Sequence, residues 1–468
     1  MDARFRHHNT HLDEPEAFAL RDPHLRELRR LPLVHRFGLL DRLPGAKPGI
    51  YTVGGGRQVG KTTLLKQWMN ELLSSGVEPR RIVFLTGELI DDHHSLVGTI
   101  TRILEDMPGG KERYLIVDEV TYIREWDRGV KYLADAGLFE EVVLVLTGSD
   151  LAFMQAARMR FPGRRGTSAD VDFHLHPLTF YETLALKGTF SDEEMASLGA
   201  RENRGNAGLM ERLFSQFEAY LVHGGFLTAI NDLAVHARVQ NATFSIYSDW
   251  IRGDALKRGK QEHYLREVLS AITRRICKQV TWNGLTRNLS IDHPQTVADY
   301  VALLESMGAV IIQAALVEDK LTGAPKKARR LMFTDPFIFH AVRGWLEPER
   351  DPYEDLAAPL LQDPERVGSL AESCAVAHFR RHFPTYYIKA EGEVDIAYID
   401  GRRFWPIEVK WSGQLRPKDL KQISKYPNAR ILSRSHHPRR VHGIPAEPLP
   451  LALLRLDAPT PQTYGRET

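Results

Sequence analysis

The sequence predicts a multidomain α/β protein, and three features of the chain support this class. Its 468 residues are enough for roughly three domains. Short apolar segments alternate with helical patterns in the first third of the chain, which is typical of a parallel sheet covered by helices on both faces. The pattern becomes helical and more polar after residue 190 and changes again from Gly368 onward. We therefore expect further domains of different architecture to follow the first.

Composition and charge restrict the class further. Hydrophobic residues make up 43% of the chain, which is ample for packed cores. The formal net charge is only +2, so any nucleic-acid surface would have to be a local patch. Cys277 and Cys374 are the only cysteines and lack the spacing of zinc ligands, which fits a reducing compartment. The sequence has no signal-peptide pattern and no apolar run of about eighteen residues. We therefore expect a soluble, cytoplasmic protein without a membrane partner.

Four apolar segments are predicted to form the strands of the first sheet: 50–53, 81–87, 114–117 and 141–149. The first is followed by GGGRQVGKTTLL, residues 54–65, which fits the phosphate-loop pattern G-x-x-x-x-G-K-[ST]. Strand, glycine loop and amphipathic helix in this order turn backbone N–H groups toward phosphates at a helix N-terminus. The pattern predicts ATP as the ligand, held by Gly55, Gly56, Arg57, Gln58, Val59, Gly60, Lys61, Thr62 and Thr63.

Two residues of the loop and two acids have specific expected roles. Lys61 is expected to reach the β- and γ-phosphates, and the Thr62 hydroxyl to ligate Mg²⁺. Asp118 and Glu119 follow the apolar run of RYLIVDEV, at the carboxyl end of a predicted parallel strand, where ligands gather in open α/β sheets. Asp118 is predicted to hold Mg²⁺, directly or through water, and Glu119 to polarise the attacking water.

The last predicted strand of this sheet ends in TGS. Thr147 and Ser149 are candidates for contacting the γ-phosphate from there, and ordinary turn chemistry explains them equally well.

The order of motifs resembles a known family. The segments DEVTYIREWDRGVKYLADAG, LTGSDL, FPGRRG, HPLTFYE and HGGFLTAI are similar to those of a prokaryotic AAA+-type ATPase family. Its members carry a C-terminal domain of unknown function that resembles PD-(D/E)XK restriction endonucleases. The resemblance covers about residues 30–455. It implies ATP hydrolysis, and a homo-oligomer is possible. It also implies that Arg164 or Arg165 stabilises charge at the ATP site, in cis or from a neighbouring subunit. The alternative is that these arginines belong to an ordinary surface turn, which explains them equally well.

We expect the chain to be divided into five parts. These are an N-terminal extension (1–30), a P-loop, AAA+-like ATPase core (31–190), a helical lid (191–261), a winged-helix domain (262–348) and a restriction-endonuclease-like α/β domain (349–468).

The winged-helix prediction depends on helix and strand patterns. Leu285 and Leu289 have the spacing of one helix, and Pro294 suits the first turn of the next. Two apolar segments, 309–317 and 331–333, follow as a predicted β-hairpin.

DNA is the partner that this pattern suggests, with packing inside an ATPase as the alternative. Gln295 and Thr296 would lie at the start of the recognition helix, where base edges are met. Basic residues of the hairpin are candidates for phosphate contacts: Lys326, Lys327, Arg329 and Arg330.

A second hairpin is predicted near the C-terminal end, around the turn Asp400-Gly401. A tight turn would place Asp395 opposite Pro406 and make it a diagonal neighbour of Glu408 on one face of the sheet. Pro406 within the second strand indicates an edge or a bulge, so the register stays open.

Two carboxylates and a lysine on one face can bind Mg²⁺ and activate water for phosphodiester cleavage. Asp395, Glu408 and Lys410 resemble the D…(D/E)-x-K core of restriction-endonuclease-like nucleases, with Asp395 and Glu408 as metal ligands. Glu372 matches the additional acid of that family. Gln422 with Tyr426 resembles the Q-x-x-x-Y element of some of its branches, which implies that it helps to orient the lysine or contacts DNA. A solvated charged face is the alternative for EVK alone, whereas the ordered set is harder to obtain by chance.

Together these patterns predict an ATPase that couples nucleotide state to DNA binding and to Mg²⁺-dependent DNA cleavage. The arginine pairs 380–381, 402–403 and 439–440 would supply a local surface for phosphates. The alternative is an ATP-dependent DNA-binding or signalling switch whose nuclease-like domain binds without cleaving.

Overall fold

The computed structural model describes residues 2–149, 159–161, 163–168, 170–200, 206–412 and 420–458. The chain forms two compact units. The first comprises Met1–His176 with Ser306–Gly308, and the second comprises Pro177–Glu305 with Ala309–Thr468. The limit between them falls at residue 176, before the predicted end of the ATPase core at 190, and the five-part division stays a prediction.

The first unit is built on a parallel five-stranded sheet in the order β2-β3-β4-β1-β5. The four predicted strands are present and are almost wholly buried, as expected for a sheet covered on both faces. A fifth strand, three residues long, is too short to leave a periodic signal in the sequence. The strands are β1 (Gly49–Gly54), β2 (Ile82–Thr86), β3 (Arg113–Asp118), β4 (Val142–Gly148) and β5 (Asp172–His174).

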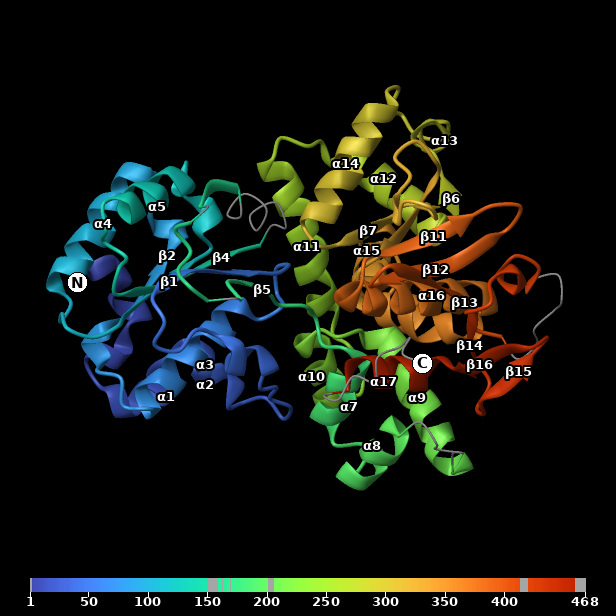
Figure 1. Cartoon of the computed structure of the whole chain (residues 1–468), viewed down its shortest axis with the longest axis horizontal. Coiled ribbons are helices and arrows are strands. Elements are labelled where there is room, and N and C mark those ends of the chain that lie inside the picture. The colour runs from blue at the N-terminus through green and yellow to red at the C-terminus, as the bar shows by residue number, and fades with distance from the viewer. Residues whose placement is uncertain are drawn as a thin grey trace. The chain divides into compact units, whose positions relative to one another are not determined.

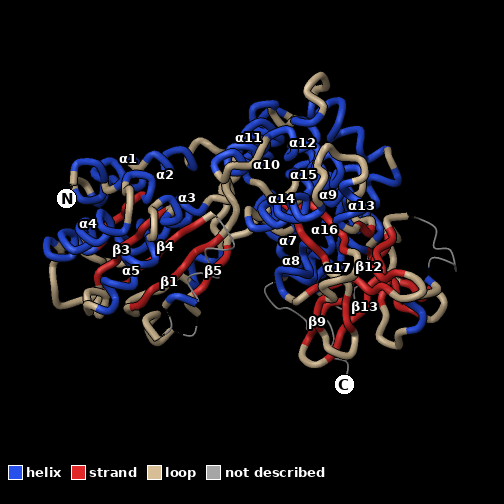
Figure 2. The backbone as a smooth tube through the Cα atoms, turned by 90° about the horizontal axis from the view of Figure 1, so that it is seen from above, coloured by secondary structure: helices blue, strands red, loops and turns tan. Residues whose placement is uncertain are grey.

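Helices cover both faces of this sheet (Figures 1 and 2). Right-handed crossovers place α3 (Lys61–Ser74) on one face, and α4 (His93–Asp106) and α5 (Trp126–Asp135) on the other. Accordingly α4 packs against α5, whereas α3 packs against α2 (Pro23–Leu28). The carboxyl ends of β1 and β3 thereby open beside the N-terminus of α3.

The N-terminal segment covers the edge of the sheet at β2. It consists of short turns of helix: η1 (Ala3–His8), η2 (Thr10–Leu12), η3 (Pro15–Ala17), α1 (Phe18–Arg21) and α2. The Asn9 side-chain amide donates to the Phe84 carbonyl and accepts from the Phe84 N–H, both at 2.7 Å, so it bonds β2 as a neighbouring strand would. His11 Nε2 lies 2.9 Å from the Ile82 carbonyl oxygen. The extension thus protects an edge strand that would otherwise present unpaired backbone groups.

Asn9→Ala is expected to lower the free energy of unfolding by about 1–3 kcal/mol, because it leaves the buried polar groups of Phe84 without partners. Urea denaturation would measure the change. His7→Ala is the matched control, since His7 is exposed and lies two residues before Asn9. A loss no larger than that of the control would contradict the edge-bonding role.

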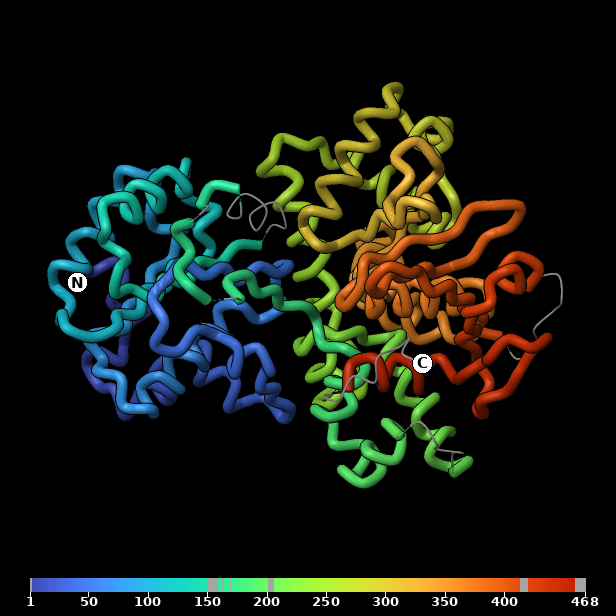
Figure 3. The backbone as a smooth tube through the Cα atoms, viewed as in Figure 1, coloured from blue at the N-terminus to red at the C-terminus, as the bar shows by residue number. Residues whose placement is uncertain are grey.

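The second unit contains a helical region and two sheets. In the first half of this unit the helices are α7 (Phe180–Lys187), α8 (Asp192–Gly199), α9 (Ala207–His223), α10 (Leu227–His236), α11 (Asn241–Lys257) and α12 (Glu262–Arg274). The last helix, α17 (Leu449–Asp457), returns to pack against α7, α8 and α9, so the end of this unit closes onto its beginning (Figure 3). Within the part of the chain that the structure describes, no helix is both long and apolar enough to span a bilayer.

Two strands of the smaller sheet follow the two predicted helices of the middle region, and its remaining strand precedes them. Its antiparallel order is β6-β10-β7. Leu289 lies beyond its predicted helix, because the chain turns after Thr286. The elements are β6 (Gln279–Val280), α13 (Trp282–Thr286), α14 (Pro294–Ser306), β7 (Val310–Gln313), β8 (Leu316–Val317), β9 (Thr322–Gly323), β10 (Arg329–Phe333) and α15 (Pro336–Leu346).

The larger sheet has six strands in the order β11-β12-β13-β14-β16-β15, and α16 packs against its first three strands. Its pairing is antiparallel from β11 to β13, parallel from β13 to β16 and antiparallel between β16 and β15. The elements are η8 (Pro352–Ala357), η9 (Ala358–Gln362), α16 (Pro364–His382), β11 (Thr385–Lys389), β12 (Glu393–Asp400), β13 (Arg403–Lys410), η11 (Ile423–Lys425), β14 (Arg430–Ser433), β15 (Arg439–Val441) and β16 (Ile444–Pro448).

The predicted register of the β12–β13 hairpin is wrong. Asp400 pairs with Arg403, so the loop residues are Gly401 and Arg402, with Gly401 at a left-handed φ of 62°. The same register, continued along the strands, brings Asp395 directly opposite Glu408 instead of diagonal to it.

Pro406 does not make β13 an edge strand. β13 lies inside the sheet, and its pairing with β14 begins at Ile407. Pro406 therefore lies in the part of the strand that is paired on one side only, where a missing N–H is tolerated.

Candidate functional site

The phosphate loop has the backbone form that its glycines allow. Gly60 has φ 96° and precedes α3, which begins at Lys61. A Cβ at Gly55 would lie 2.5 Å from the Leu175 carbonyl oxygen, so only glycine fits that close approach. The loop therefore meets the helix N-terminus with its backbone turned as an anion site requires.

Lys61 lies at the centre of the predicted site. Its Nζ donates to the carbonyl oxygens of Gly55 and Gly56, each at 3.0 Å, and forms an ion pair with Glu119 Oε1 at 3.2 Å. Both side chains are largely buried. The P-loop cation and the proposed water-orienting acid are thus in direct contact.

Hydrogen bonds connect α3, β3 and β4 at the ends of the strands. Thr62 Oγ1 donates to Asp118 Oδ2, and Thr147 Oγ1 donates to Asp118 Oδ1, both at 2.6 Å. Thr147 Oγ1 in turn accepts from the Glu119 N–H at 2.8 Å. Thr147 is wholly buried, and its hydroxyl donates its hydrogen bond to Asp118. Thr147 therefore positions the two acids and does not contact the γ-phosphate.

Glu119 is held in an uncommon conformation. Its φ is 51°, a left-handed value that is costly for a residue other than glycine. Its Oε2 is buried without a hydrogen-bond partner. A Cβ at Gly87 would lie 2.5 Å from the Glu119 carbonyl oxygen, so the end of β2 approaches Glu119 closely.

These residues line a pocket of about 370 Å³. Six of the predicted loop residues take part, and Arg57 is held there by its hydrogen bond to the Tyr122 hydroxyl at 2.5 Å. Val59 is buried instead of lining the pocket. The lining comprises Arg57, Gln58, Gly60, Lys61, Thr62, Thr63, Asp118 and Glu119, and also the unpredicted His8, His24, Phe84, Thr86, Glu88 and Tyr122. Thr86 ends β2 and Glu88 comes two residues later. The predicted pairing of this strand with the strand that ends in Asp118 could have indicated both residues, whereas no sequence signal indicates the two histidines.

The candidate arginines have partners within the first unit. Arg165 pairs with Asp172 at 2.6 Å and donates to Thr52 Oγ1, which ties β1 to β5. This buried structural position argues against Arg165 as the charge-stabilising residue. Arg164 pairs with Asp135, and its predicted role, like that of Ser149 directly after β4, stays a prediction.

The predicted acidic residues of the second unit converge. Asp395 on β12 and Glu408 on β13 are buried, and Lys410 Nζ lies 2.7 Å from Glu408 Oε1. Glu372 on α16 reaches the same cluster through Arg330, whose Nη2 lies 2.6 Å from Glu372 Oε1 and 3.2 Å from Asp395 Oδ1.

Burial raises the pKa values of Glu372 and Glu408, and the neighbouring Asp395 raises both further. Burial opposes a charged lysine, but the surrounding carboxylates outweigh it and raise the pKa of Lys410. Burial of three acids beside only two cations therefore favours the protonated, neutral forms of Glu372 and Glu408.

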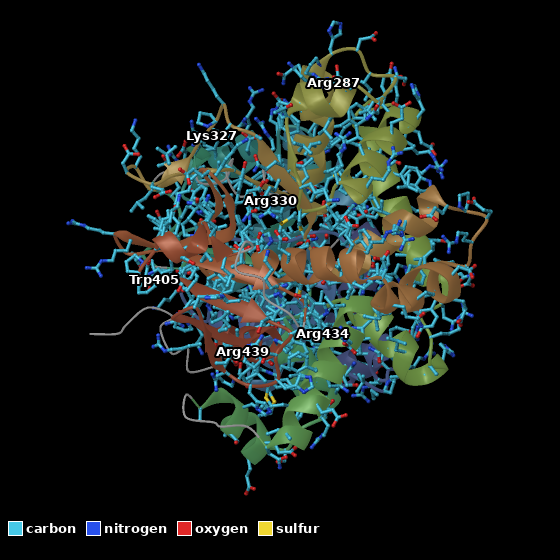
Figure 4. All side chains as sticks on the ribbon, turned by 90° about the vertical axis from the view of Figure 1, so that its right-hand side faces the viewer. Arg287, Lys327, Arg330, Trp405, Arg434 and Arg439 are labelled. Atoms are coloured by element: carbon cyan, nitrogen blue, oxygen red, sulfur yellow. The ribbon has the colours of Figure 1, made fainter. Side chains whose placement is uncertain are left out.

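Arg330 corrects one expectation. Lys326 and Lys327 are exposed, and Arg329 lies over the Trp282 ring at 4.2 Å. Arg330 is only 5% exposed and lies inside the unit, whereas Lys327 lies toward its outer edge (Figure 4). The predicted contact of Arg330 with DNA phosphates is wrong, because the Arg330 charge is buried and paired with Glu372 and Asp395.

The donor atoms of this cluster suit a divalent cation only in part. Carboxylate oxygens are the ligands that Mg²⁺ prefers, and Glu408 Oε2 is buried without a hydrogen-bond partner. Both oxygens of Asp395 are already engaged, by Arg330 and by the Val409 N–H at 2.9 Å. Accordingly, no group of three His, Cys, Asp or Glu side chains is arranged to hold a metal among the residues that the structure describes.

The hydrogen bonds of Gln422 and Tyr426 go to each other and to groups outside the acidic cluster. Gln422 Oε1 accepts from the Gly392 N–H, and Nε2 donates to the Tyr426 hydroxyl, both at 3.3 Å. Tyr426 in turn donates to Glu318 Oε1 at 2.8 Å. Gln422 therefore does not orient Lys410 in this arrangement.

The strand order of the first unit, with a phosphate loop after β1 and paired acids at the end of β3, defines a P-loop ATPase domain. Residues 47–184 match a family model described as an AAA domain, and residues 214–349 match one described as a domain of unknown function, DUF8612. The chain thus carries an AAA domain, which binds ATP. The acidic cluster lies outside the AAA match, and all of it except Arg330 lies outside both matched ranges.

Relatives of known sequence or structure are distant. An uncharacterized protein of Haemophilus influenzae is 23% identical over 272 residues, which are 55% of this chain and 60% of that protein. This chain thus covers less than two thirds of that relative. A Walker-type ATPase of Pyrococcus abyssi is 12% identical, with a TM-score of 0.38 over 63% of this chain and 91% of its own. The ORC1 protein of Aeropyrum pernix, solved in complex with DNA, is 16% identical, with a TM-score of 0.31 over 73% and 94%.

Proposed function

We propose that this protein hydrolyses ATP with Mg²⁺ and uses the nucleotide state as a conformational switch. The observation that carries the proposal is the bonded set Thr62, Asp118, Thr147 and Glu119 beside Lys61. A hydroxyl and a carboxylate oxygen joined at 2.6 Å suit Mg²⁺. When bound, the ion neutralises charge on the β- and γ-phosphates.

The residues of the chain then have separate tasks. Lys61 exchanges its contact with Glu119 for phosphate oxygens, and this exchange frees the Glu119 carboxylate. Glu119 is held by its own backbone N–H on Thr147, so its carboxylate stays at the pocket and accepts a hydrogen bond from the attacking water. Occupation by ATP is thereby coupled to activation of the water-orienting acid.

The direct test is ATP binding and phosphate release by the full chain, with Lys61→Ala beside the wild type. We expect binding and hydrolysis in the wild type and loss of both in the variant. A wild-type protein that binds no ATP would refute the proposal.

We propose a second candidate activity, Mg²⁺-dependent cleavage of DNA, for the second unit. This activity is favoured by the side chains that converge in the second unit: Asp395, Glu408 and Lys410, with Glu372 on the preceding helix. The assignment of these elements to a restriction-endonuclease-like fold is part of the proposal. Asp395 and Glu408 would hold the ion, for which Asp395 must give up Arg330. A bound ion would lower the pKa of a water molecule, and Lys410 would stabilise the charge that develops on the phosphate.

In this proposal, the region from α12 to β10 binds DNA. Its elements follow the order of a winged helix, and Gln295 and Thr296 lie in the first turn of α14. Exposed Lys326 and Lys327, with the arginine pairs 402–403 and 439–440, would meet phosphates. A cytoplasmic location and self-association stay predictions.

Lys410→Ala is expected to abolish cleavage while ATP hydrolysis persists, because the Lys410 ammonium pairs with Glu408 of the acidic cluster and belongs to the second unit. The assay uses linear, nicked, branched and single-stranded DNA with Mg²⁺ or Mn²⁺, with and without ATP. Lys61→Ala shows whether nucleotide alters rate or substrate choice, and Lys425→Ala, an exposed lysine paired with Glu391, is the control. ATP-sensitive DNA retention without any cut that depends on Lys410 would favour the binding switch, and weak DNA affinity at low salt would favour a signalling role.

A further inference from the structure

Two histidines from the N-terminal segment line the nucleotide pocket. His8 is the last residue of η1, and His24 is the second residue of α2. Both are half-buried and share the pocket lining with Lys61, Thr62 and Asp118. The AAA match begins only at residue 47, so this chain completes its nucleotide pocket with residues from outside the matched range.

A single lysine holds both histidines in place. Lys66 lies on α3, the helix that begins with the P-loop lysine. Its Nζ donates to the His8 carbonyl oxygen at 2.5 Å and pairs with Asp22 Oδ2 at 3.3 Å. Asp22 caps α2 by accepting from the His24 N–H at 3.0 Å. Both segments are therefore fixed to the helix that presents Lys61 and Thr62 to the phosphates.

A segment that only covers the sheet edge would not require the buried ion pair between Lys66 and Asp22. Lys66 and Asp22 are almost completely buried, and Lys66 Nζ lies 3.8 Å from the centre of the Phe84 ring. The His8 ring stacks on the same Phe84 at 5.8 Å. Burying an ion pair costs desolvation that apolar side chains would avoid. The pair is better explained by the positions that it imposes on the two histidines.

The pocket lining identifies the part of the nucleotide that these histidines face. The pocket is formed by the phosphate loop, by Asp118 and Glu119, and by Thr86 at the end of β2. These groups surround the terminal phosphate, the bound ion and the attacking water, not the base. An imidazole donates a hydrogen bond through at least one ring nitrogen whether it is neutral or charged.

We propose that His8 and His24 bind the terminal phosphate of ATP, and the inorganic phosphate formed from it, so that the site prefers ATP to ADP. This inference rests on the proposed ATPase function and adds two residues to its substrate-binding set. The N-terminal segment thereby serves the ATP site as well as the sheet edge.

The test compares ATP and ADP affinity of the full chain with fluorescent nucleotide analogues. His8→Ala and His24→Ala are each expected to weaken ATP binding about five- to tenfold, which is the effect of one hydrogen bond, and to change ADP binding less than about twofold. The control is the exposed neighbour, His7→Ala, which should change neither. Where an alanine variant does not fold, His8→Phe or His24→Phe keeps the ring without the donor and should give the same result.

Outcomes of this comparison separate the two proposals. Equal losses of ATP and ADP affinity, or no loss of either, would overturn this inference alone, provided that the wild type binds ATP and Lys61→Ala does not. A wild type that binds neither nucleotide would overturn the proposed function with it. His8→Gln and His24→Gln keep an N–H donor, so recovery of the ATP preference in them would support a hydrogen bond to the phosphate.

Discussion

Glu119→Gln is expected to lower kcat for ATP hydrolysis by about 10²- to 10⁴-fold, the range for loss of a positioned general base. Glu119 Oε2 is buried without a partner, and the Glu119 N–H is fixed on Thr147, so the carboxylate is positioned before the substrate arrives. Glutamine keeps the size but cannot accept a proton. ATP affinity should persist or rise, because Lys61 no longer has a carboxylate partner to leave.

Phosphate release and binding of a fluorescent ATP analogue would separate these two effects. Glu88→Gln is the matched control, since Glu88 lines the same pocket but is exposed. If Glu119→Gln kept more than a tenth of the wild-type rate, or if the control lost as much, the attacking water would have to be oriented by another residue.

The ATP site was largely predictable because its signals are local. Gly60, Lys61 and Thr62 are consecutive, and Asp118 with Glu119 ends a strand whose parallel pairing brings it beside β4. Contact between these segments follows from the rule that ligands gather at the carboxyl ends of parallel strands. His8 and His24 had no such signal, because their place depends on the fold of the whole N-terminal segment around Lys66.

In the second unit, sequence patterns predicted which acids form a group but not the strand register or the position of Arg330. Glu372, Asp395, Glu408 and Lys410 were identified as a group, but the turn at Gly401 moved the register and made two diagonal acids direct neighbours. Arg330 looked like a surface residue because it follows lysines in a polar loop. β10 is in fact buried on both faces after Arg329, and no pattern within the strand distinguishes a buried arginine that meets acids from distant segments.

Arg330→Met is expected to lower the free energy of unfolding by about 3–5 kcal/mol, the usual result of removing one partner from a buried charged group. The guanidinium pairs with both Glu372 and Asp395, and its loss leaves these buried acids without the cation that they share. Chemical denaturation would measure the change. Arg329→Met, which removes a partly exposed neighbour stacked on Trp282, should cost much less.

The double variant Arg330→Met/Glu372→Gln shows whether this cost is electrostatic. If Arg330 serves to neutralise the cluster, removing one acid should restore a large part of the lost stability, and the two substitutions will be far from additive. Additive losses would mean that Arg330 acts through packing against Tyr387 and its bond to the Cys277 carbonyl instead. The same pair of variants bears on the proposed cleavage, because an ion at Asp395 must replace the guanidinium. Arg330→Met should therefore bind Mn²⁺ more tightly than the wild type, whereas equal affinities would argue that Arg330 does not compete for that site.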